Sequence, residues 1–413
     1  MTIREMGQRA CEARVLLARA GGAVKRAALE AIAYALEENA GAIIAANAED
    51  LAAGKANGMS PALLDRLALD EARIAGMAKG VREVAAEEDP VGQVRWGAVR
   101  PNGLRIEKIT VPLGVIGVIF EARPNVCSDA AALCLMAGNA CILRGGKEAI
   151  NSNKAIAGVM RGALEKAGLP ADCVQLVEDT SRQGAAEMMA LTGLIDVLIP
   201  RGGAGLIRAV VENARVPVIE TGAGNCHIYV DESADIAMAA DIVFNAKTSR
   251  PSVCNAAESL LVHRDIAAKA LPAIAARLAE KDVELRGDEA ACSILPNAVP
   301  AMDEDWATEY GAYIMSVKVV DSLEAALSHI DRYSTHHSEA IITSDYASAE
   351  RFLREVDSAA VYVNASTRFT DGGEFGFGAE IGISTQKLHA RGPLGLANLV
   401  SEKYLVRGNG QIR

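Results

Sequence analysis

The segment Val115-Ile116-Gly117-Val118-Ile119-Phe120 opens the part of the sequence that decides the fold. From here to residue 224, short apolar runs alternate with amphipathic stretches, and the runs lie at 115–120, 140–144, 174–177, 196–199 and 216–220. Apolar strands that alternate with helices are typical of βαβ units, whose parallel strands are joined by right-handed crossovers. The spacing therefore predicts a doubly wound parallel sheet of the α/β class.

Polar or glycine-rich turns follow four of these strands. They read Phe120-Glu121-Ala122-Arg123-Pro124-Asn125, Arg144-Gly145-Gly146-Lys147, Pro200-Arg201-Gly202-Gly203 and Glu220-Thr221-Gly222-Ala223-Gly224. Such turns are often only tight connections. Ligands of doubly wound sheets bind at the carboxyl ends of the strands, however, and glycines with cations at helix N-termini favour a phosphate there. The first strand is not followed by G-x-G-x-x-G, which argues against an ordinary Rossmann dehydrogenase.

The sequence on either side of this region predicts three further parts. Residues 1–92 have the three- and four-residue apolar spacing of helices, and we assign them with 111–224 to one domain. Residues 93–110 alternate in polarity around Asn102-Gly103, which predicts a β-hairpin. A second α/β region spans 225–390, and we expect the tail, 391–413, to return to the hairpin and form an oligomerisation arm with it.

Composition narrows the function classes. The 413 residues include 42 Lys+Arg and 53 Asp+Glu, a formal net charge of −11, which argues against non-specific binding to nucleic acid or an anionic membrane. Half of the residues are apolar, yet no run suggests a signal peptide or a transmembrane helix. The eight cysteines show no zinc-ligand spacing, so we expect no metal and free thiols in the cytoplasm.

One cysteine has a setting that suits a nucleophile. Cys254 lies in Arg250-Pro251-Ser252-Val253-Cys254-Asn255, after helical sequence and beside a cation and an amide. We expect this loop to open another helix, because a helix N-terminus and a nearby guanidinium lower the pKa of a thiol. A lone cysteine is more often structural, and we interpret the other seven cysteines in that way.

The order of several motifs resembles the aldehyde dehydrogenase superfamily. These motifs are Pro112-Leu113-Gly114-Val115-Ile116-Gly117-Val118-Ile119, Ala137-Gly138-Asn139, the Cys254 segment and Glu309-Tyr310-Gly311. Longer blocks resemble the branch that reduces L-glutamyl 5-phosphate with NADPH, namely 120–126, 200–204, 220–227, 250–255 and 333–340. The resemblance implies a parallel-sheet NADP-binding domain of 1–92 and 111–224, a catalytic domain of 225–390, and the hairpin arm.

The resemblance also implies a phosphorylating aldehyde dehydrogenase of L-proline biosynthesis. The Cys254 thiolate would displace phosphate from L-glutamyl 5-phosphate, and hydride from NADPH would reduce the thioester to L-glutamate 5-semialdehyde. The Cys254 N–H and the Asn125 amide are the implied oxyanion donors, although Asn125 could also be a plain cap after a proline. The implied partners are a second copy of the chain and the glutamate 5-kinase that makes the acyl phosphate.

Residues for the two ligands follow from the same resemblance. Those implied for NADP are Arg144, Lys147, Arg201, Gly202, Gly203, Glu220 and Glu309, and charge suggests Arg250 and Arg368 for the substrate phosphate. Glu220 matches a water-activating base of oxidising relatives, which a phosphorylating reductase does not need. Two alternatives remain open: another oxidoreductase of the superfamily, or a non-redox cysteine acyltransferase or hydrolase, for which no histidine dyad motif is visible.

Overall fold

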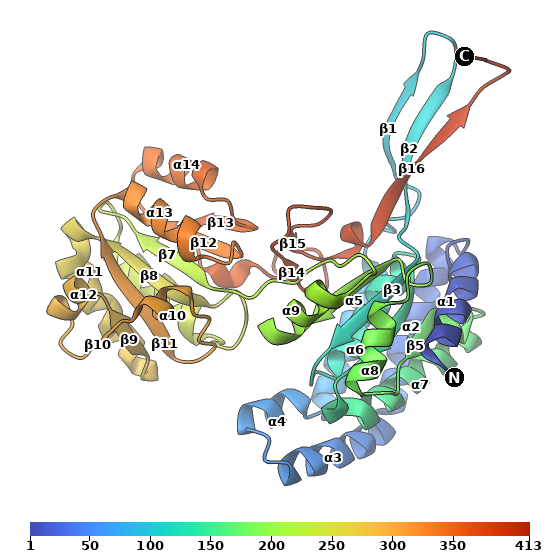
Figure 1. The fold of residues 1–413 in the computed structure, drawn as a ribbon, viewed down its shortest axis with the longest axis horizontal. Coiled ribbons are helices and arrows are strands. Elements are labelled where there is room, and N and C mark those ends of the chain that lie inside the picture. Colours follow the sequence, from blue (N-terminus) through green and yellow to red (C-terminus); the bar gives the residue numbers. More distant parts are fainter. The chain divides into compact units, whose positions relative to one another are not determined.

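The chain folds into two compact units, each built on its own parallel sheet (Figure 1). A computed structural model describes residues 1–61 and 63–413. Unit 1 comprises Met1–Thr221, Gly376–Gly382 and Leu394–Arg413. Unit 2 comprises Gly222–Phe375 and Ile383–Pro393.

The sheet of unit 1 has four parallel strands in the order β5-β4-β3-β6. The strands are β3 (Val115–Phe120), β4 (Ala140–Arg144), β5 (Val174–Leu176) and β6 (Val197–Arg201). All six residues of β3 are buried, as expected for a strand covered on both faces. The chain moves outward from β3 to β5 and then returns to the other side of β3, so the strand order reverses between β3 and β6. This confirms the doubly wound parallel sheet and places its ligand crevice at that reversal.

Helices cover this sheet. The connections and the segment after β6 hold α6 (Asn125–Met136), α7 (Ile150–Lys166), α8 (Arg182–Met189) and α9 (Ala204–Asn213). The N-terminal part holds α1 (Ile3–Leu17), α2 (Gly22–Glu38), α3 (Ala40–Ala56), α4 (Pro61–Leu67) and α5 (Glu71–Ala86), and α2 packs against α5 and α7. Across the described ranges of the chain, no helix is both long enough and apolar enough to cross a membrane.

One predicted strand of unit 1 is wrong. Residues 216–220 form a single parallel bridge between Val218 and Leu198 instead of a strand. The Leu198 N–H donates to the Pro217 carbonyl over 2.8 Å, and Ile219 N–H donates to the Leu198 carbonyl over 2.9 Å. Pro217 has no N–H of its own to extend the ladder.

The predicted hairpin is confirmed, and the chain tail adds a third strand to it. β1 (Val94–Val99), β2 (Arg105–Pro112) and β16 (Val400–Arg407) form an antiparallel sheet in the order β1-β2-β16. Gly103 in the turn has φ +86°, a conformation that favours glycine. Most residues of β1 and β16 are exposed, and Figure 1 shows the three strands extending away from the rest of unit 1.

Unit 2 is the second α/β region. Its seven parallel strands lie in the order β10-β9-β11-β8-β7-β12-β13. The strands are β7 (Cys226–Val230), β8 (Ala257–His263), β9 (Glu284–Gly287), β10 (Val299–Pro300), β11 (Ile314–Val320), β12 (Ser338–Ile342) and β13 (Ala360–Val363). The helices are α10 (Ile236–Thr248), α11 (Arg264–Leu278), α12 (Glu289–Ile294), α13 (Leu323–Tyr333) and α14 (Tyr346–Glu355), and β14 (Ile383–Ser384) pairs with β15 (Gly392–Pro393).

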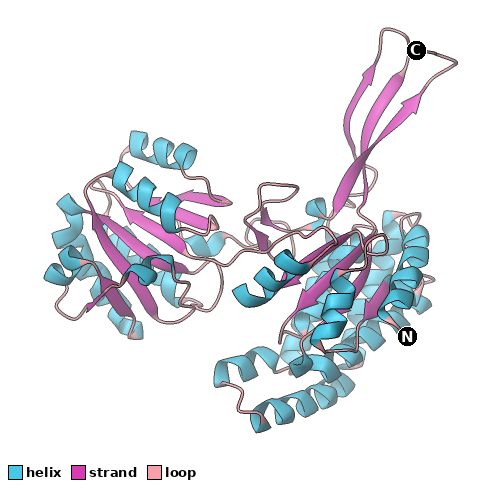
Figure 2. Ribbon diagram, viewed as in Figure 1, coloured by secondary structure: helices cyan, strands magenta, loops and turns pink.

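Two apolar layers hold unit 2 together, one on each face of its sheet. Ile228 and Leu260 pack with residues of α10 and α11, whereas Tyr229 and Leu261 pack with residues of α13 and α14. Successive residues of a strand point to opposite faces, so neighbouring apolar residues supply both layers. Figure 2 shows the strands of unit 2 lying between helices.

A buried histidine gives unit 2 a testable dependence on pH. His329 lies among the rings of His227, Trp306 and Tyr333, with centroids 4.7 to 5.6 Å away. Burial, together with the nearby His227, lowers the pKa of His329 to about 3. The folded protein therefore keeps His329 neutral, whereas the unfolded chain binds a proton below pH about 6.5. Stability due to this residue should fall as the pH decreases from about 6.5 towards 3.

We expect His329→Phe to remove this loss, because phenylalanine keeps the aromatic packing and has no proton to bind. In urea unfolding, the free energy of unfolding of the variant minus that of the wild type should increase by about 3 kcal/mol as the pH is lowered from 6.5 to 4. An unchanged pH dependence in the variant would contradict the assignment.

Candidate active site

The loop that carries Cys254 joins α10 to β8. Helix α10 ends at Thr248 and β8 begins at Ala257, so the loop comprises residues 249–256. The prediction that this loop opens a helix is wrong, because the apolar run that follows is a buried strand between β7 and β11. Cys254 is half-buried, and among the described residues none of the eight cysteines forms a disulfide.

Gly224 lies just before β7 and Cys226 is its first residue, and both hold the main chain of Cys254 in place. The Cys226 thiol donates to the Cys254 carbonyl over 3.1 Å, and Cys226 is fully buried. A Cβ atom on Gly224 would lie 1.4 Å from the same carbonyl oxygen and 2.7 Å from the Cys254 Cα. Real Cβ atoms never approach this closely, so the backbone of Cys254 requires glycine at position 224.

The residue after Cys254 is held by a different segment. The Asn255 amide donates to the Thr370 carbonyl over 2.9 Å, and the Thr367 hydroxyl donates to the Asn255 carbonyl over 2.7 Å. The Arg368 guanidinium donates to the Asn255 side-chain oxygen and, over 3.0 Å, to the Ser249 hydroxyl. The loop that carries Cys254 is thus tied to residues 366–370, which follow β13.

Two arginines place positive charge beside the loop. Burial lowers the pKa of Arg368, while Asp371 and Cys254 act in the opposite direction and Arg250 lowers it further. Arg250 and Cys254 therefore both lie within electrostatic reach of Arg368. Arg250 is exposed, and Arg368 is half-buried.

Glu309, also in unit 2, is linked to Cys254 through Gly224. Its carboxylate accepts a hydrogen bond of 3.0 Å from the Gly224 N–H, and Gly224 packs directly on Cys254. The carboxylate is on an exposed residue. Tertiary structure thus brings together four segments that are far apart in sequence: the 224–226 segment, the Cys254 loop, Glu309 and Arg368.

The other predicted residues lie in unit 1, at the carboxyl ends of its strands. Arg144 ends β4 and donates to the Thr180 and Ser181 carbonyls over 2.7 and 3.0 Å. Lys147 begins the short 3₁₀ helix that follows, Arg201 ends β6, and Gly202 and Gly203 connect β6 to α9. The half-buried Glu220 comes two residues after the Val218 bridge.

Asn125 lies in the first turn of α6, directly after Pro124. Its amide donates to the Asp129 carboxylate over 2.9 Å, and burial raises the pKa of Asp129 to about 6. The amide is on an exposed residue at a helix start, which is compatible with either of its two predicted uses.

The unit 1 residues fit an anionic dinucleotide on the β4 side of the crevice. The Arg144 Nε is buried without a hydrogen-bond partner among the described residues, so an unsatisfied cationic donor faces the end of β4. A Cβ on Gly146 would lie 2.4 Å from the Glu148 carboxylate, so that side chain would have to move to admit one. The start of α9 differs: the Gly203 N–H donates to the Glu121 carboxylate over 2.8 Å, so a side chain already satisfies it.

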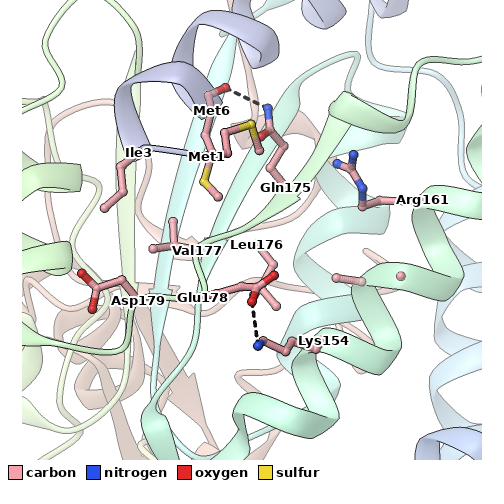
Figure 3. A pocket seen from close by; sticks show the side chains of 12 residues that line it. Met1, Ile3, Met6, Lys154, Arg161, Gln175, Leu176, Val177, Glu178 and Asp179 are labelled. Carbon is pink, nitrogen blue, oxygen red and sulfur yellow. Dashed lines mark hydrogen bonds and ion pairs between the residues drawn. The ribbon is translucent and has the colours of Figure 1, made fainter.

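A cavity of about 590 Å³ in unit 1 contains none of the predicted site residues (Figure 3). It is lined by Met1, Ile3 and Met6, by residues of α7 and by residues 175–179. Gln175 donates to the Met6 carbonyl over 2.8 Å, and Lys154 pairs with Glu178 over 2.6 Å. Gln175 and Lys154 thus have polar partners within the protein, and none of the predicted site residues lines this cavity.

Comparison with known proteins identifies the family. The model of the aldehyde dehydrogenase family matches residues 2–292. The chain belongs to the aldehyde dehydrogenase family. As a member of this family, it is an enzyme that acts on a small molecule with a nicotinamide cofactor. The predicted fold class is confirmed with it: an α/β protein with two parallel sheets and an antiparallel hairpin sheet.

Within the family, the chain is similar to proteins named gamma-glutamyl phosphate reductase. It is 59% identical over 413 residues to the one from Moorella thermoacetica, covering 100% of this chain and 99% of that one. It is 61% identical over 389 residues to that from Clostridium novyi, covering 94% and 93%. The crystal structure of the Thermotoga maritima protein superimposes with a TM-score of 0.97 at 49% identity, covering 99% of both chains. These similarities confirm the branch that the sequence blocks indicated.

The sequence did not indicate three residues that contact the Cys254 loop or flank it: Cys226, Lys247 and Glu258. Cys226 was grouped with the structural thiols, and Lys247 and Glu258 were not singled out. Cys226 and Gly224 both lie in the quoted 220–227 block, whose density of glycine beside a cysteine was the available signal. No sequence pattern pointed to Lys247 and Glu258, because their ion pair forms only when α10 and β8 come together in the fold.

Proposed function

We propose that the chain catalyses the NADPH-dependent reduction of L-glutamyl 5-phosphate to L-glutamate 5-semialdehyde and phosphate. The observation that carries this proposal is the immobilised Cys254, with Arg250 and Arg368 beside it. Relatives at about 60% identity that are named gamma-glutamyl phosphate reductase support the substrate. The substrate must come from a kinase that phosphorylates the 5-carboxylate of glutamate, and glutamate 5-kinase is the proposed partner.

Cys254 is the proposed nucleophile. Its thiolate attacks the acyl carbon, the C–O bond to phosphate breaks, and a thioester forms. Arg250 and Arg368 neutralise the leaving phosphate. NADPH supplies a hydride when bound. The reduced thiohemiacetal then breaks its C–S bond, which releases the aldehyde and regenerates the thiolate. The Cys254 N–H and Asn125 are the proposed donors to the tetrahedral oxyanions.

The proposed cofactor-binding residues act by charge and close backbone approach. Arg144, Lys147 and Arg201 are suited to the phosphates, including the 2′-phosphate that distinguishes NADP from NAD. Gly202 and Gly203 allow close approach, with the Glu121 carboxylate moving from the α9 start when an anion takes its place. Glu309 is proposed to hold a ribose hydroxyl, and Glu220 to serve with the cofactor-binding residues without activating water.

The hairpin arm is proposed to pair with a second copy of the chain. Trp96, Tyr404 and Val406 on its strands are between 48% and 61% exposed, and they line a hollow of about 580 Å³ with Ile106, Lys108 and Arg100. Monomeric proteins rarely leave aromatic and aliphatic residues together on a thin sheet in water. A homo-oligomer would bury them.

The reverse reaction provides the test. Purified wild-type protein should reduce NADP⁺ in the presence of L-glutamate 5-semialdehyde only when inorganic phosphate is added. Turnover without phosphate would identify an oxidising aldehyde dehydrogenase instead. Release of glutamate from the acyl phosphate without any nucleotide would identify a cysteine hydrolase.

Arg250 should contribute to phosphate binding without contributing to stability. We expect Arg250→Met to raise the KM for phosphate roughly tenfold, the effect of one lost charge-assisted hydrogen bond. The melting temperature should not change, because the residue is exposed. Arg264→Met, which removes another exposed arginine of unit 2, is the matched control and should leave the KM unchanged. An equal effect of both variants would contradict a local role for Arg250.

A further inference from the structure

A buried ion pair closes the base of the loop that carries Cys254. Lys247, in the last turn of α10, donates from Nζ to Oε2 of Glu258 on β8 over 2.5 Å. Both side chains are completely excluded from solvent. The two residues stand on opposite sides of the loop 249–256, so the pair joins the two ends of the loop.

Stability does not account for this pair. Burial raises the pKa of Glu258 to about 7 and lowers the pKa of Lys247, so both charged forms pay for desolvation. Replacing a buried ion pair with apolar residues of similar volume is often neutral or stabilising. A buried ion pair with this cost of desolvation suggests a role in positioning the residues around it.

The second oxygen of Glu258 reaches a different segment. Oε1 accepts a hydrogen bond of 3.1 Å from the Gly311 N–H. Gly311 has φ +59°, and a Cβ built on it would lie 4.0 Å from the Cα of Ser252 in the nucleophile loop. Lys247 also faces the Tyr310 ring, with Nζ 5.9 Å from its centroid. The ion pair thus holds residues 309–311 against the loop.

The contacts continue from this segment back to Cys254. Glu309, two residues before Gly311, accepts the Gly224 N–H over 3.0 Å. Gly224 in turn packs on the Cys254 carbonyl. Glu258, Gly311, Glu309, Gly224 and Cys254 are therefore linked in one continuous set of contacts, in which Lys247 balances the charge of Glu258.

We propose that Lys247 and Glu258 are positioning residues that set Glu309 and Cys254 in register with one another. The inference rests on the proposed function, because it takes Cys254 as the nucleophile and Glu309 as a cofactor-binding residue. Glu258 acts through its hydrogen bond to Gly311. Lys247 acts by supplying the positive charge that the buried carboxylate needs.

Two charge-free double variants separate positioning from stability. K247M/E258L fills the space but leaves the Gly311 N–H without its acceptor. K247M/E258Q also removes both charges, yet its amide oxygen can still accept that hydrogen bond. We expect both to fold with melting temperatures near the wild type. K247M/E258L should raise the KM for NADP⁺ and lower kcat, each by about tenfold or more, because small displacements of reacting groups cost this much.

K247M/E258Q should recover most of that loss, whereas a purely structural pair would give two doubles of equal activity. The inference is overturned if K247M/E258L keeps both constants within about twofold of the wild type, or if the two doubles are equally impaired at unchanged melting temperature. If K247M/E258L does not fold, K247M/E258M is read in the same way.

A matched control and a second readout complete the design. K25M/D89N removes an ion pair of unit 1 between the buried Lys25 and the half-buried Asp89, 2.7 Å apart, and should affect stability alone. The rate at which iodoacetamide alkylates Cys254 should change about fivefold or more in K247M/E258L and less than twofold in the control. Alkylation needs no substrate. If the wild type showed no phosphate-dependent turnover, the proposed function would be rejected, but the alkylation rates would still test the inference.

Discussion

Cys254→Ser is expected to lower kcat for phosphate-dependent NADP⁺ reduction by about 10⁴-fold or more, the scale seen when a catalytic nucleophile is removed. A serine hydroxyl at neutral pH is a far weaker nucleophile than a thiolate, and an oxygen ester would be a poorer intermediate for hydride transfer. The melting temperature should change little, because the side chain is only half-buried. Steady-state kinetics and a thermal melt test both expectations.

Cys292→Ser is the matched control for this substitution. Cys292 is another half-buried thiol of unit 2, and it donates to the Gly287 carbonyl over 3.3 Å, a bond that a hydroxyl can also make. We expect this variant to keep kcat within about threefold of the wild type. If Cys254→Ser kept more than a few per cent of the wild-type kcat, the proposed covalent mechanism would have to be abandoned.

Gly224→Ala is expected to have the second largest effect, through a single methyl group. The added Cβ would lie 1.4 Å from the Cys254 carbonyl oxygen and 2.3 Å from its carbonyl carbon. These are main-chain atoms, which cannot move aside as a flexible side chain could. We expect a loss of stability of about 3 kcal/mol or more and a fall in kcat of at least about 100-fold in the protein that still folds.

Gly76→Ala controls for the change of residue type. Gly76 lies within α5, and a Cβ there meets nothing within 4 Å apart from its own helix. Alanine favours a helix over glycine by about 1 kcal/mol, so this variant should be as stable as the wild type or more so. A Gly224→Ala enzyme with wild-type kcat and melting temperature would show that the loop is not held as described.

The sequence predicted the parts of the fold that depend on local pattern. The buried run 115–120 indicated a covered strand, because its five apolar residues and one glycine suit both faces of a sheet. Asn102-Gly103 predicted the hairpin turn for a local reason, since Gly103 adopts a positive φ. The strand over 216–220 failed where one residue, Pro217, lacks the donor that pairing needs.

The candidate site divides in the same way. The sequence indicated Cys254, and its position beside Arg250 follows from adjacency in the chain. The sequence also suggested that the loop carrying Cys254 opens a helix. In the structure this loop leads directly into β8, which lies between β7 and β11. The activation of the thiol by a helix dipole was therefore a wrong expectation.

By itself, the sequence determined the class of fold and the family branch and indicated Cys254 as the candidate nucleophile, since these depend on hydrophobic period and on motifs contiguous in the chain. Tertiary structure alone decided what holds the nucleophile in place. The Cys226 thiol, the Gly224 backbone and the Lys247–Glu258 pair reach Cys254 or its loop from separate elements. Such contacts depend on which strands become neighbours, and the local spacing of apolar residues does not determine the order of strands in a sheet.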